Sequence, residues 1–530
     1  MRVTVVTPPP LKPSEPGLSG GAAASRLAAI GADARWIDAS IGWHRFALEP
    51  ARLHRAIDAA RGLPAGDLRA MRRAADHLSQ RTPALRRPET YADRGVYTSA
   101  VADLENALRA AALATPGFRL GVAMIALDGR RLESSATLAE LAGERGPFDD
   151  YFHDELVPAI EAAPPDVVAV SLTFQQQAPA AFRLARMLRD RMPGVRRVLG
   201  GPLLACWAEA GLPIEGALFD DFHSVVRGSD ADLARIAGSV APAPAPPVLS
   251  IPLADAPWDD YLAPRPVVPA ALGRGCHFGR CTFCPDHLHK GHAPTGFDAL
   301  EAWLHEVAAR FPGGAMLHLT DSALPPAHLD RLAEVIHRDR LPLEWHGFVR
   351  ADAAFADPAF TRKLAAGGCA MLQFGIESGS PEVLRRLGKG VRPDQARRVL
   401  AATGEAGIRT HVYLLFGTPG ETEADRELTL SFVRESAHHI HAINASLLNL
   451  PIDSVMRRHA PKFGITEILP FAGDTDLSLA VDFRCGDSNP RREARAWLAR
   501  RFAKDDKVKG IQGRLRASFK ANHLCFLGGD

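Results

Sequence analysis

The chain has 530 residues, of which 46% are hydrophobic and 23% are charged, so it is long enough for two or three domains with large buried cores. Its net charge of +2 gives no reason to expect a nucleic-acid or membrane partner, and no apolar run reaches the roughly 18 residues that a spanning helix needs. The proline-rich start does not predict a signal peptide, and seven cysteines, three of them clustered, do not indicate a disulfide framework, so we expect a cytoplasmic protein.

Residues 1–240 predict a doubly wound, Rossmann-like α/β domain. Short apolar runs that indicate buried strands alternate with helical stretches, which is typical of a parallel sheet. Ligands bind to such sheets at the carboxyl ends of the strands, where glycine-rich turns let the backbone come close. The predicted strands are residues 2–6, 34–38, 165–173, 197–202 and 224–228, and the predicted helices include residues 17–30 and several between 48 and 113.

Three further regions follow. Residues 241–250 are rich in proline and alanine and predict an extended linker. Residues 251–455 alternate strands and helices again and predict a partial (β/α)6 barrel, in which the chemistry lies at the carboxyl ends of the strands. Residues 456–530 are expected to form a small α-rich segment that closes the barrel and shapes a substrate pocket. The predicted barrel strands are residues 266–272, 315–319, 343–349, 371–376, 410–416 and 442–448.

Cys276, Cys281 and Cys284 lie within nine residues at the start of this barrel, with the spacing C-x4-C-x2-C. Clustered thiolates suit zinc or an iron–sulfur cluster. Three cysteines leave one iron of a four-iron cluster open to a small molecule, whereas a closed zinc site needs a fourth ligand, for which His287 is available. A zinc-stabilised binding module is therefore the alternative to an enzyme.

The loop from Gly275 to Cys284 resembles the cluster loop of the radical S-adenosylmethionine (SAM) superfamily, although the usual spacing is C-x3-C-x2-C. The resemblance implies a [4Fe–4S] cluster whose open iron binds SAM and whose electron cleaves it to a deoxyadenosyl radical. It also implies SAM contacts at Phe283 and at the strand ends. Phe283 and Gly417 match positions near the adenine, Glu377 and Ser378 the ribose-binding stretch, Arg350 the carboxylate contact, and Thr320, Asp321 and Ser322 the amino-group contact.

The first domain is similar to the cobalamin-binding domain that precedes many radical SAM enzymes. The D-x-H-x-x-G motif that supplies a cobalt ligand elsewhere is absent, and His223 follows Asp221 and Phe222 without the glycine, so we interpret it as an ordinary histidine. Ser229 and Asp230 also stand where relatives usually have Glu-Gly. The residues that the resemblance assigns to cobalamin are Pro8, Ser171, Thr173, Gln175, Gly200, Gly201, Arg227 and Gly228.

The combined resemblance implies a cobalamin-dependent radical SAM enzyme, most simply a methyltransferase acting on an unactivated carbon or phosphorus of a biosynthetic intermediate. One SAM would methylate the cobalamin, and a second would give the radical that activates the substrate. The alternative within the same family is a rearrangement or cyclisation without methyl transfer. A methylthiotransferase is disfavoured because the first domain lacks the additional cysteines of that family. The expected partners are a small-molecule or peptide substrate and an external reductant such as flavodoxin or ferredoxin.

Overall fold

The computed structural model describes residues 1–238, 248–285 and 291–514, and these form two compact units. The first unit comprises Met1–Pro269 together with Ala472–Ser478, and the second comprises Ala270–Phe471 and the described residues from Leu479 on. Both units are α/β structures with parallel sheets, which confirms the predicted fold class. The division after Pro269 lies beyond the expected linker at residues 241–250, most of which is outside the described residues.

The first unit is built on a five-stranded sheet with the order β2-β1-β5-β6-β7, and every neighbouring pair is parallel. Its elements in chain order are β1 (Arg2–Thr7), α1 (Leu18–Ala29), β2 (Asp33–Asp38), α2 (Ala39–Ala47), α3 (Pro50–Ala59), α4 (Ala65–Ala84), α5 (Pro88–Ala92), α6 (Arg94–Ala111), β3 (Phe118–Gly121), β4 (Met124–Leu127), α7 (Ser135–Gly143), α8 (Asp149–Tyr151), α9 (Val157–Glu161), β5 (Val167–Ser171), α10 (Ala178–Arg191), β6 (Arg196–Gly200), α11 (Pro202–Glu209), β7 (Ser224–Val225), α12 (Asp230–Ala237) and β8 (Leu249–Ser250).

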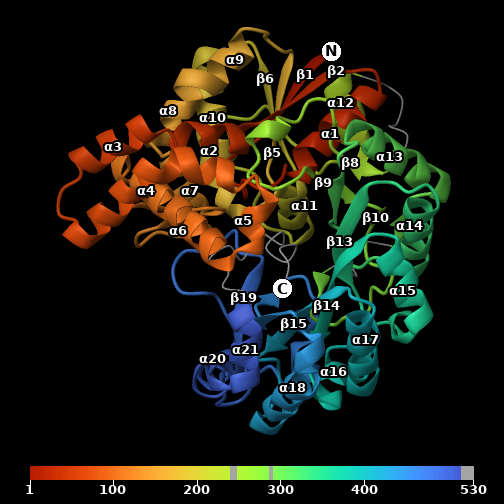
Figure 1. The fold of residues 1–530 in the computed structure, drawn as a ribbon. Coiled ribbons are helices and arrows are strands. Elements are labelled where there is room, and N and C mark those ends of the chain that lie inside the picture. Colours follow the sequence, from red (N-terminus) through yellow and green to blue (C-terminus); the bar gives the residue numbers. More distant parts are fainter. Residues whose placement is uncertain (239–247, 286–290, 515–530) are drawn as a thin grey trace. The chain divides into compact units, whose positions relative to one another are not determined.

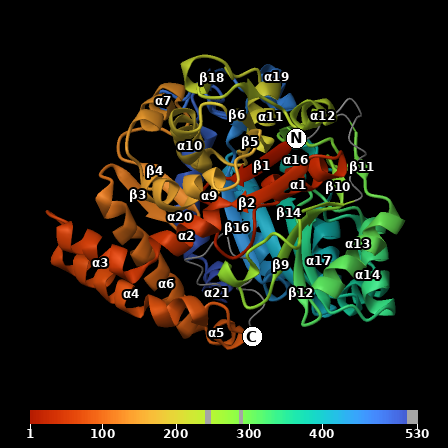
Figure 2. The ribbon, with the colours of Figure 1, turned by 90° about the horizontal axis from the view of Figure 1, so that it is seen from above.

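The direction of strand addition reverses between β1 and β5. In open parallel sheets, this switch point is where ligands bind, because the two crossover connections leave on opposite faces and open a crevice between them. The chain between β2 and β5 is unusually long and carries the helices α3, α4 and α6, which pack on one another as Figure 2 shows. The antiparallel hairpin β3–β4 in the same stretch was not predicted from the sequence.

The second unit is built on strands of a parallel sheet whose full order is β16-β15-β14-β13-β12-β9-β8 (Figure 1). Its elements in chain order are β9 (Val267–Ala271, which begins in the first unit), β10 (Gly273–Arg274), β11 (Ala293–Pro294), α13 (Phe297–Arg310), β12 (Ala315–Leu319), α14 (Pro326–Arg338), β13 (Leu343–Val349), α15 (Pro358–Ala366), β14 (Cys369–Glu377), α16 (Pro381–Arg386), α17 (Pro393–Glu405), β15 (Arg409–Phe416), α18 (Glu423–Ser436), β16 (Ala442–Leu447), β17 (Leu450–Pro451), α19 (Val455–Arg458), β18 (Glu467–Leu469), β19 (Ala480–Arg484), α20 (Pro490–Arg500) and α21 (Asp506–Arg514).

Helices cover one face of this sheet. Successive helices α13, α14, α15, α17 and α18 contact one another in turn, and Figure 1 shows α14, α15 and α17 along the same side of β13 and β14. The strand residues that face them are fully buried and apolar: Phe374 meets Phe355 edge to face, and the indole of Trp345 donates to Gly367 O at 2.8 Å. Alternation along each strand therefore turns the intervening residues to the opposite face of the sheet.

The last part of the chain contributes to both units. A small antiparallel sheet, β17-β19-β18, and the helices α20 and α21 belong to the second unit. The segment Ala472–Ser478 belongs to the first, where Leu477 N–H donates to Glu133 O at 2.8 Å and the indole of Trp207 donates to Leu477 O at 3.1 Å. The Ser134 hydroxyl, next to Glu133, donates to the carboxylate of Asp474 in the same segment. Among the described residues, no helix is long and apolar enough to cross a membrane.

Candidate functional site

The three-cysteine loop follows β9 and β10, at the carboxyl edge of the second sheet. Cys276, Cys281 and Cys284 are all half-buried and none forms a disulfide. Gly275 has a φ of +75°, and a Cβ there would lie 2.7 Å from Gly291 O, so the entry to the loop requires glycine. Cys284 N–H donates to Cys281 O at 3.2 Å and closes a tight turn at the end of the motif.

The sulfur atoms of the loop do not converge as ligands of one ion would. In a tetrahedral site with Zn–S bonds of about 2.3 Å, the sulfurs lie roughly 3.8 Å apart. The one group of three ligating atoms within 4.8 Å of one another in the described part of the chain is instead Glu301, His305 and Asp339. Sulfurs bound to three different irons of a cluster stand farther apart than those around one zinc, so a spread of more than 4.8 Å among the three does not conflict with a cluster. His287, the fourth ligand of the zinc alternative, lies outside the described residues.

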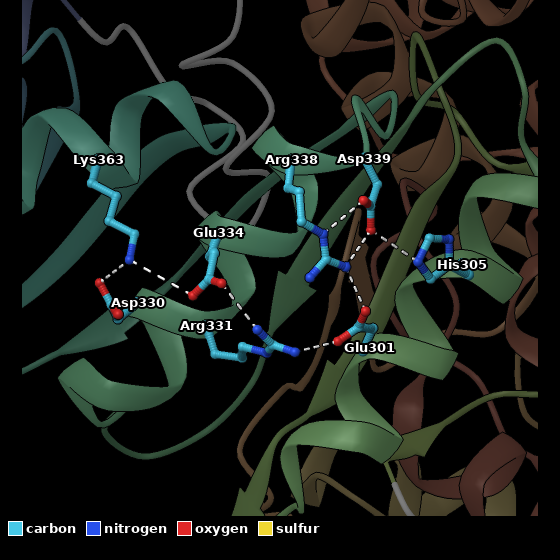
Figure 3. Close-up of polar contacts among 8 residues, drawn as sticks. All are labelled: Glu301, His305, Asp330, Arg331, Glu334, Arg338, Asp339 and Lys363. Carbon is cyan, nitrogen blue, oxygen red and sulfur yellow. Dashed lines mark hydrogen bonds and ion pairs between the residues drawn. The ribbon is translucent and has the colours of Figure 1, made fainter.

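The Glu301 group is an ion-pair network rather than a metal site (Figure 3). Arg338 bridges Glu301 and Asp339, and its guanidinium lowers the pKa of Asp339, while Arg331 also pairs with Glu301. His305 Nε2 lies 3.2 Å from the Asp339 carboxylate. Arginine nitrogens already pair with both carboxylates at this surface of α13 and α14. We therefore interpret the group as a surface ion-pair network without a catalytic or metal-binding role.

Thr282 clamps the cysteine loop to neighbouring segments. Its N–H donates to Leu387 O at 2.9 Å, its hydroxyl donates to Arg386 O at 2.9 Å, and its own carbonyl accepts from Met456 N–H at 2.8 Å. Phe283 packs its ring into the apolar cluster around Val383 and Leu387. The side chain of Phe283 is therefore an anchor, so only its backbone remains for the predicted adenine contact.

Arg350, at the end of β13, lies beside a cluster ligand. The side chain is only 4% exposed, and its Nη1 is 4.0 Å from Cys281 Sγ while its Nη2 donates to Lys389 O at 2.7 Å. The guanidinium stacks 3.4 Å from the centre of the Phe278 ring and also pairs with Asp352 at 3.3 Å. Burial raises the pKa of Cys281, and the nearby Lys389 and Arg350 oppose that rise by favouring the thiolate.

Glu377 ends β14 in a conformation that side chains rarely adopt. Its φ is +67°, and the register between β14 and β15 shifts at this point. The carboxylate accepts from Lys389 Nζ at 2.8 Å, and both side chains are nearly buried, at 12% and 8% exposure. A Cβ at Gly375 would lie 2.7 Å from Glu377 Oε1, so that glycine makes room for the pair. Backbone strain of this kind persists where the surrounding structure enforces it, most often at functional sites.

Ser378 follows Glu377 but turns away from the pair. Its hydroxyl shares a hydrogen bond with the Thr429 hydroxyl at 2.9 Å, and it is 1% exposed. The sequence analysis assigned no role to Lys389. Its role as the partner of Glu377 came from the structure, because twelve residues and a helix separate the two.

The Thr320–Ser322 turn after β12 combines a structural residue with two exposed ones. Asp321 accepts from Leu272 N–H at 2.9 Å, and burial raises its pKa to about 6. Thr320 donates its hydroxyl to Ala270 O at 3.1 Å, and Ser322 is exposed. Asp321 thus holds the end of β9, directly before the cysteine loop, and Thr320 and Ser322 are the members of this turn that remain accessible.

Gly417 begins the turn after β15. Its φ is +71°, its N–H donates to Glu421 Oε2 at 2.6 Å, and a Cβ there would lie 3.0 Å from Arg491 Cα. Burial raises the pKa of Glu421 to about 7, although Arg426 lies 3.5 Å away. The turn is therefore fixed by a buried carboxyl group, which the sequence analysis did not single out.

In the first unit, the loops after β1 and β5 meet at the switch point through uncharged groups. Gln177 donates from Nε2 to Pro8 O at 2.6 Å, and its Oε1 accepts from Thr173 N–H at 3.0 Å. The Ser19 hydroxyl, at the start of α1, bonds both Ser171 at 3.0 Å and Thr173 at 2.5 Å. Three predicted residues, Pro8, Ser171 and Thr173, therefore lie together, joined by Ser19 and Gln177.

The remaining predicted cobalamin residues lie on the loops after β5, β6 and β7. Gly201 has a φ of +110°, and a Cβ there would lie 2.4 Å from Leu172 O, so the β6 turn packs directly on the β5 loop. A Cβ at Gly200 would meet Val226 at 2.9 Å. Gln175 donates to Leu132 O and is thereby tied to the segment after β4.

The end of β7 carries the last two of these residues. Arg227 is exposed, with its N–H donating to Asp232 at 3.1 Å, and Gly228 O accepts from Arg26. His223 accepts from Arg197 N–H at 3.0 Å, which supports its interpretation as an ordinary histidine.

Comparison with known proteins places this site in a family. Residues 271–433 match the model of the Radical SAM superfamily. The chain is 25% identical over 361 residues to a protein from Pyrococcus horikoshii described as the uncharacterized methyltransferase PH0819, covering 61% of this chain and 74% of that one. It is 28% identical over 288 residues to the ribosomal protein uS12 methylthiotransferase RimO of Roseiflexus castenholzii, covering 51% and 59%.

Among solved structures, the fold resembles that of OxsB, described as a cobalamin-dependent S-adenosylmethionine radical enzyme, with a TM-score of 0.51 and 13% identity. The match covers 66% of this chain and 60% of OxsB, so less than two thirds of that protein is represented. The family match assigns the cysteine loop to a radical SAM domain, whose cofactors are a [4Fe–4S] cluster and SAM. Residues 271–433 are thus a radical SAM domain.

Proposed function

We propose that this radical SAM enzyme is cobalamin-dependent and transfers a methyl group to an unactivated carbon, or phosphorus, of a biosynthetic intermediate. The observation that carries the proposal is the order of the two units. A parallel sheet with uncharged groups at its switch point precedes a radical SAM domain, as expected for the cobalamin-dependent class to which OxsB belongs. The relative described as a methyltransferase supports methyl transfer over rearrangement.

The residues of the second unit would bind and orient the cofactors. Cys276, Cys281 and Cys284 would ligate three irons, and the buried Arg350 cation beside Cys281 Sγ would stabilise the negative charge that a cluster carries. Glu377 would accept hydrogen bonds from the SAM ribose, with Lys389 holding its carboxylate in place. When bound, the cluster and SAM supply a radical that removes a substrate hydrogen, and cobalamin supplies a methyl carrier.

The first unit would hold cobalamin through backbone and hydroxyl groups. The loop after β1 contains no histidine, so the residues fit a cobalamin held without a histidine ligand from that loop. Phe174, next to Thr173, exposes 54% of its surface. A corrin ring bound at this edge would cover the exposed phenyl ring. Cys206 is the single cysteine before residue 270, which argues against the methylthiotransferase chemistry of RimO.

The test is the metal content and product of anaerobically purified protein from cells supplied with cobalamin. We expect about four irons and one cobalt per chain, with SAM cleaved to 5′-deoxyadenosine and a labelled methyl group appearing in a product. Iron without cobalt would refute the cobalamin dependence. A product rearranged but not methylated would favour the rearrangement alternative, and zinc without iron would refute the enzyme.

A further inference from the structure

One face of the second sheet, opposite its helices, carries a row of flat polar side chains. The register pairs His318 with His346 across β12 and β13, and Gln373 with His411 across β14 and β15. Tyr413 lies two residues beyond His411 and so shares its face. We call these five residues the inner face; none of them was selected from the sequence.

The rings of the inner face contact one another. The imidazoles of His318 and His346 stack with their centres 4.5 Å apart and their planes at 22°. The Tyr413 ring lies 4.4 Å from His411 and 5.1 Å from Phe348, which also faces this side. Such a surface offers ring faces and edges on which another planar group can stack.

Gln373 supplies a directional contact within this row. Its side chain is fully buried, and its Oε1 accepts from the Tyr413 hydroxyl at 2.7 Å. Burial raises the pKa of Tyr413, so the phenol stays protonated and remains the donor. That donation orients the amide and leaves Gln373 Nε2 with no hydrogen-bond partner among the described residues. A buried donor in this state destabilises the protein unless an acceptor reaches it.

The groups around Gln373 on this face, which are Phe348, His411 and Tyr413, carry no charge. Burial lowers the pKa of His411 to about 4, so its imidazole is neutral near pH 7. The ionisable neighbours on the same face lie at its ends: Glu344 and Arg409 at the beginnings of β13 and β15, and Glu377, paired with Lys389, at the end of β14. A charged ligand placed beside Gln373 would lose its hydration without gaining a counter-charge there.

We propose that the inner face is a substrate-binding surface for a neutral, planar group with a hydrogen-bond acceptor, such as a carboxamide or a heteroaromatic ring. The acceptor meets Gln373 Nε2, and the plane of the group stacks against Tyr413 and the neighbouring imidazoles. This inference rests on the proposed function, because it names the class of substrate that the radical SAM domain acts on.

Three probes of nearly the same shape test the proposal: benzamide, benzoate and benzamidinium. We would titrate each into the full-length, cluster-reconstituted protein with SAM present and follow binding by ligand-observed NMR. Benzamide is expected to bind at least tenfold more tightly than either charged probe. Gln373→Leu should weaken benzamide about tenfold, because the unpaired donor is lost, whereas Gln80→Leu, on the exposed face of α4, should leave its affinity unchanged.

Gln373→Glu sharpens the test by reversing the preference. The carboxylate has the shape of the amide but takes a cation, so this variant should bind benzamidinium more tightly than benzamide. Tyr413→Phe removes the hydroxyl that orients the amide and should lower the affinity for benzamide less than Gln373→Leu does. Iron content and melting temperature, measured on every variant, show which proteins remain folded and loaded.

Equal affinity for the three probes, no binding of benzamide, or insensitivity to both Gln373 variants would overturn the proposal. These outcomes are separate from failure of the proposed function. That function fails on the iron and cobalt content and on SAM cleavage by the unaltered protein, none of which depends on which probe binds.

Discussion

The switch point of the first sheet and the carboxyl edge of the second sheet differ in their chemistry. In the first unit, Ser19, Ser171, Thr173 and Gln177 satisfy one another through neutral hydrogen bonds. In the second unit the edge holds buried charges and a strained backbone, with Glu377 paired to Lys389. A neutral edge suits a large cofactor held by shape and many weak contacts, whereas buried charges suit a small charged ligand next to a redox centre.

Removal of a cluster ligand is expected to have the largest effect, and to affect only the second unit. Cys281→Ala should abolish cluster assembly and 5′-deoxyadenosine formation, because three thiolates are needed to hold the irons, yet leave cobalamin retention by the first unit intact. Iron content, cobalt content and SAM cleavage measure the three effects. Cys206→Ala, in the first unit, is the control and should retain the cluster. Loss of cobalt together with iron in Cys281→Ala would mean that the two edges do not act separately.

Adding one methyl group at Gly201 should disrupt the carboxyl edge of the first sheet. Gly201→Ala places a Cβ 2.4 Å from Leu172 O at a φ of +110°, so we expect the first unit to lose about 4 kcal/mol of unfolding free energy and its cobalamin. Gly216→Ala is the matched control. Its φ is +99°, but a Cβ there has nothing within 4 Å, so it measures backbone strain alone. Denaturant unfolding compares them, and equal losses would contradict the packing argument.

The second edge depends on its buried pair. Lys389→Met leaves the Glu377 carboxylate nearly buried without its partner, and should cost about 3 kcal/mol of unfolding free energy and weaken SAM binding. Adding Glu377→Gln to that variant should restore much of the stability but not the SAM affinity. Chemical denaturation and equilibrium dialysis with SAM distinguish the two. If the double variant were no more stable than Lys389→Met, the pair would not be the cause of the loss.

The pH dependence of the unfolding free energy also distinguishes the second edge, through Asp321. Because burial raises the pKa of Asp321 from 3.8 to about 6, the folded second unit binds a proton more tightly than the unfolded chain. Its contribution to stability is full below pH 4 and is lost as the pH rises through 6, by roughly 3 kcal/mol. Asp321→Asn should flatten this part of the unfolding profile, whereas Asp330→Asn, in an exposed ion pair, should not. A wild-type stability that rises between pH 4 and 6 in step with Asp321 would contradict the assignment.

The sequence predicted the strands well where burial is continuous. The runs 315–319 and 343–349 match β12 and β13 to the residue, because short, mainly apolar segments bounded by glycine, proline or charge have few alternatives. The hairpin β3–β4 was missed because its two strands are only four residues long and partly exposed.

The candidate site was less accessible to sequence reasoning. The cysteines and the strand-end residues could be selected because each follows a recognisable run. The pairing of Glu377 with Lys389, the anchoring role of Asp321 and the shared face of Gln373 and Tyr413 depend on contacts between segments 12 to 49 residues apart in the chain. Local pattern does not encode such contacts, since they arise only when the sheet register is set.

The segment Ala472–Ser478 limits how the two units can be exchanged between related proteins, in evolution or by design. Because it completes the first unit through Leu477, Trp207 and Glu133, the two units are not consecutive blocks of the gene. A chimaera that joined residues 1–269 to the barrel of a relative would carry a foreign strip in place of this one and leave the indole of Trp207 without its acceptor. Exchange of the first unit between relatives must therefore transfer two separate stretches of coding sequence together, which ties the evolution of the first unit to that of the second.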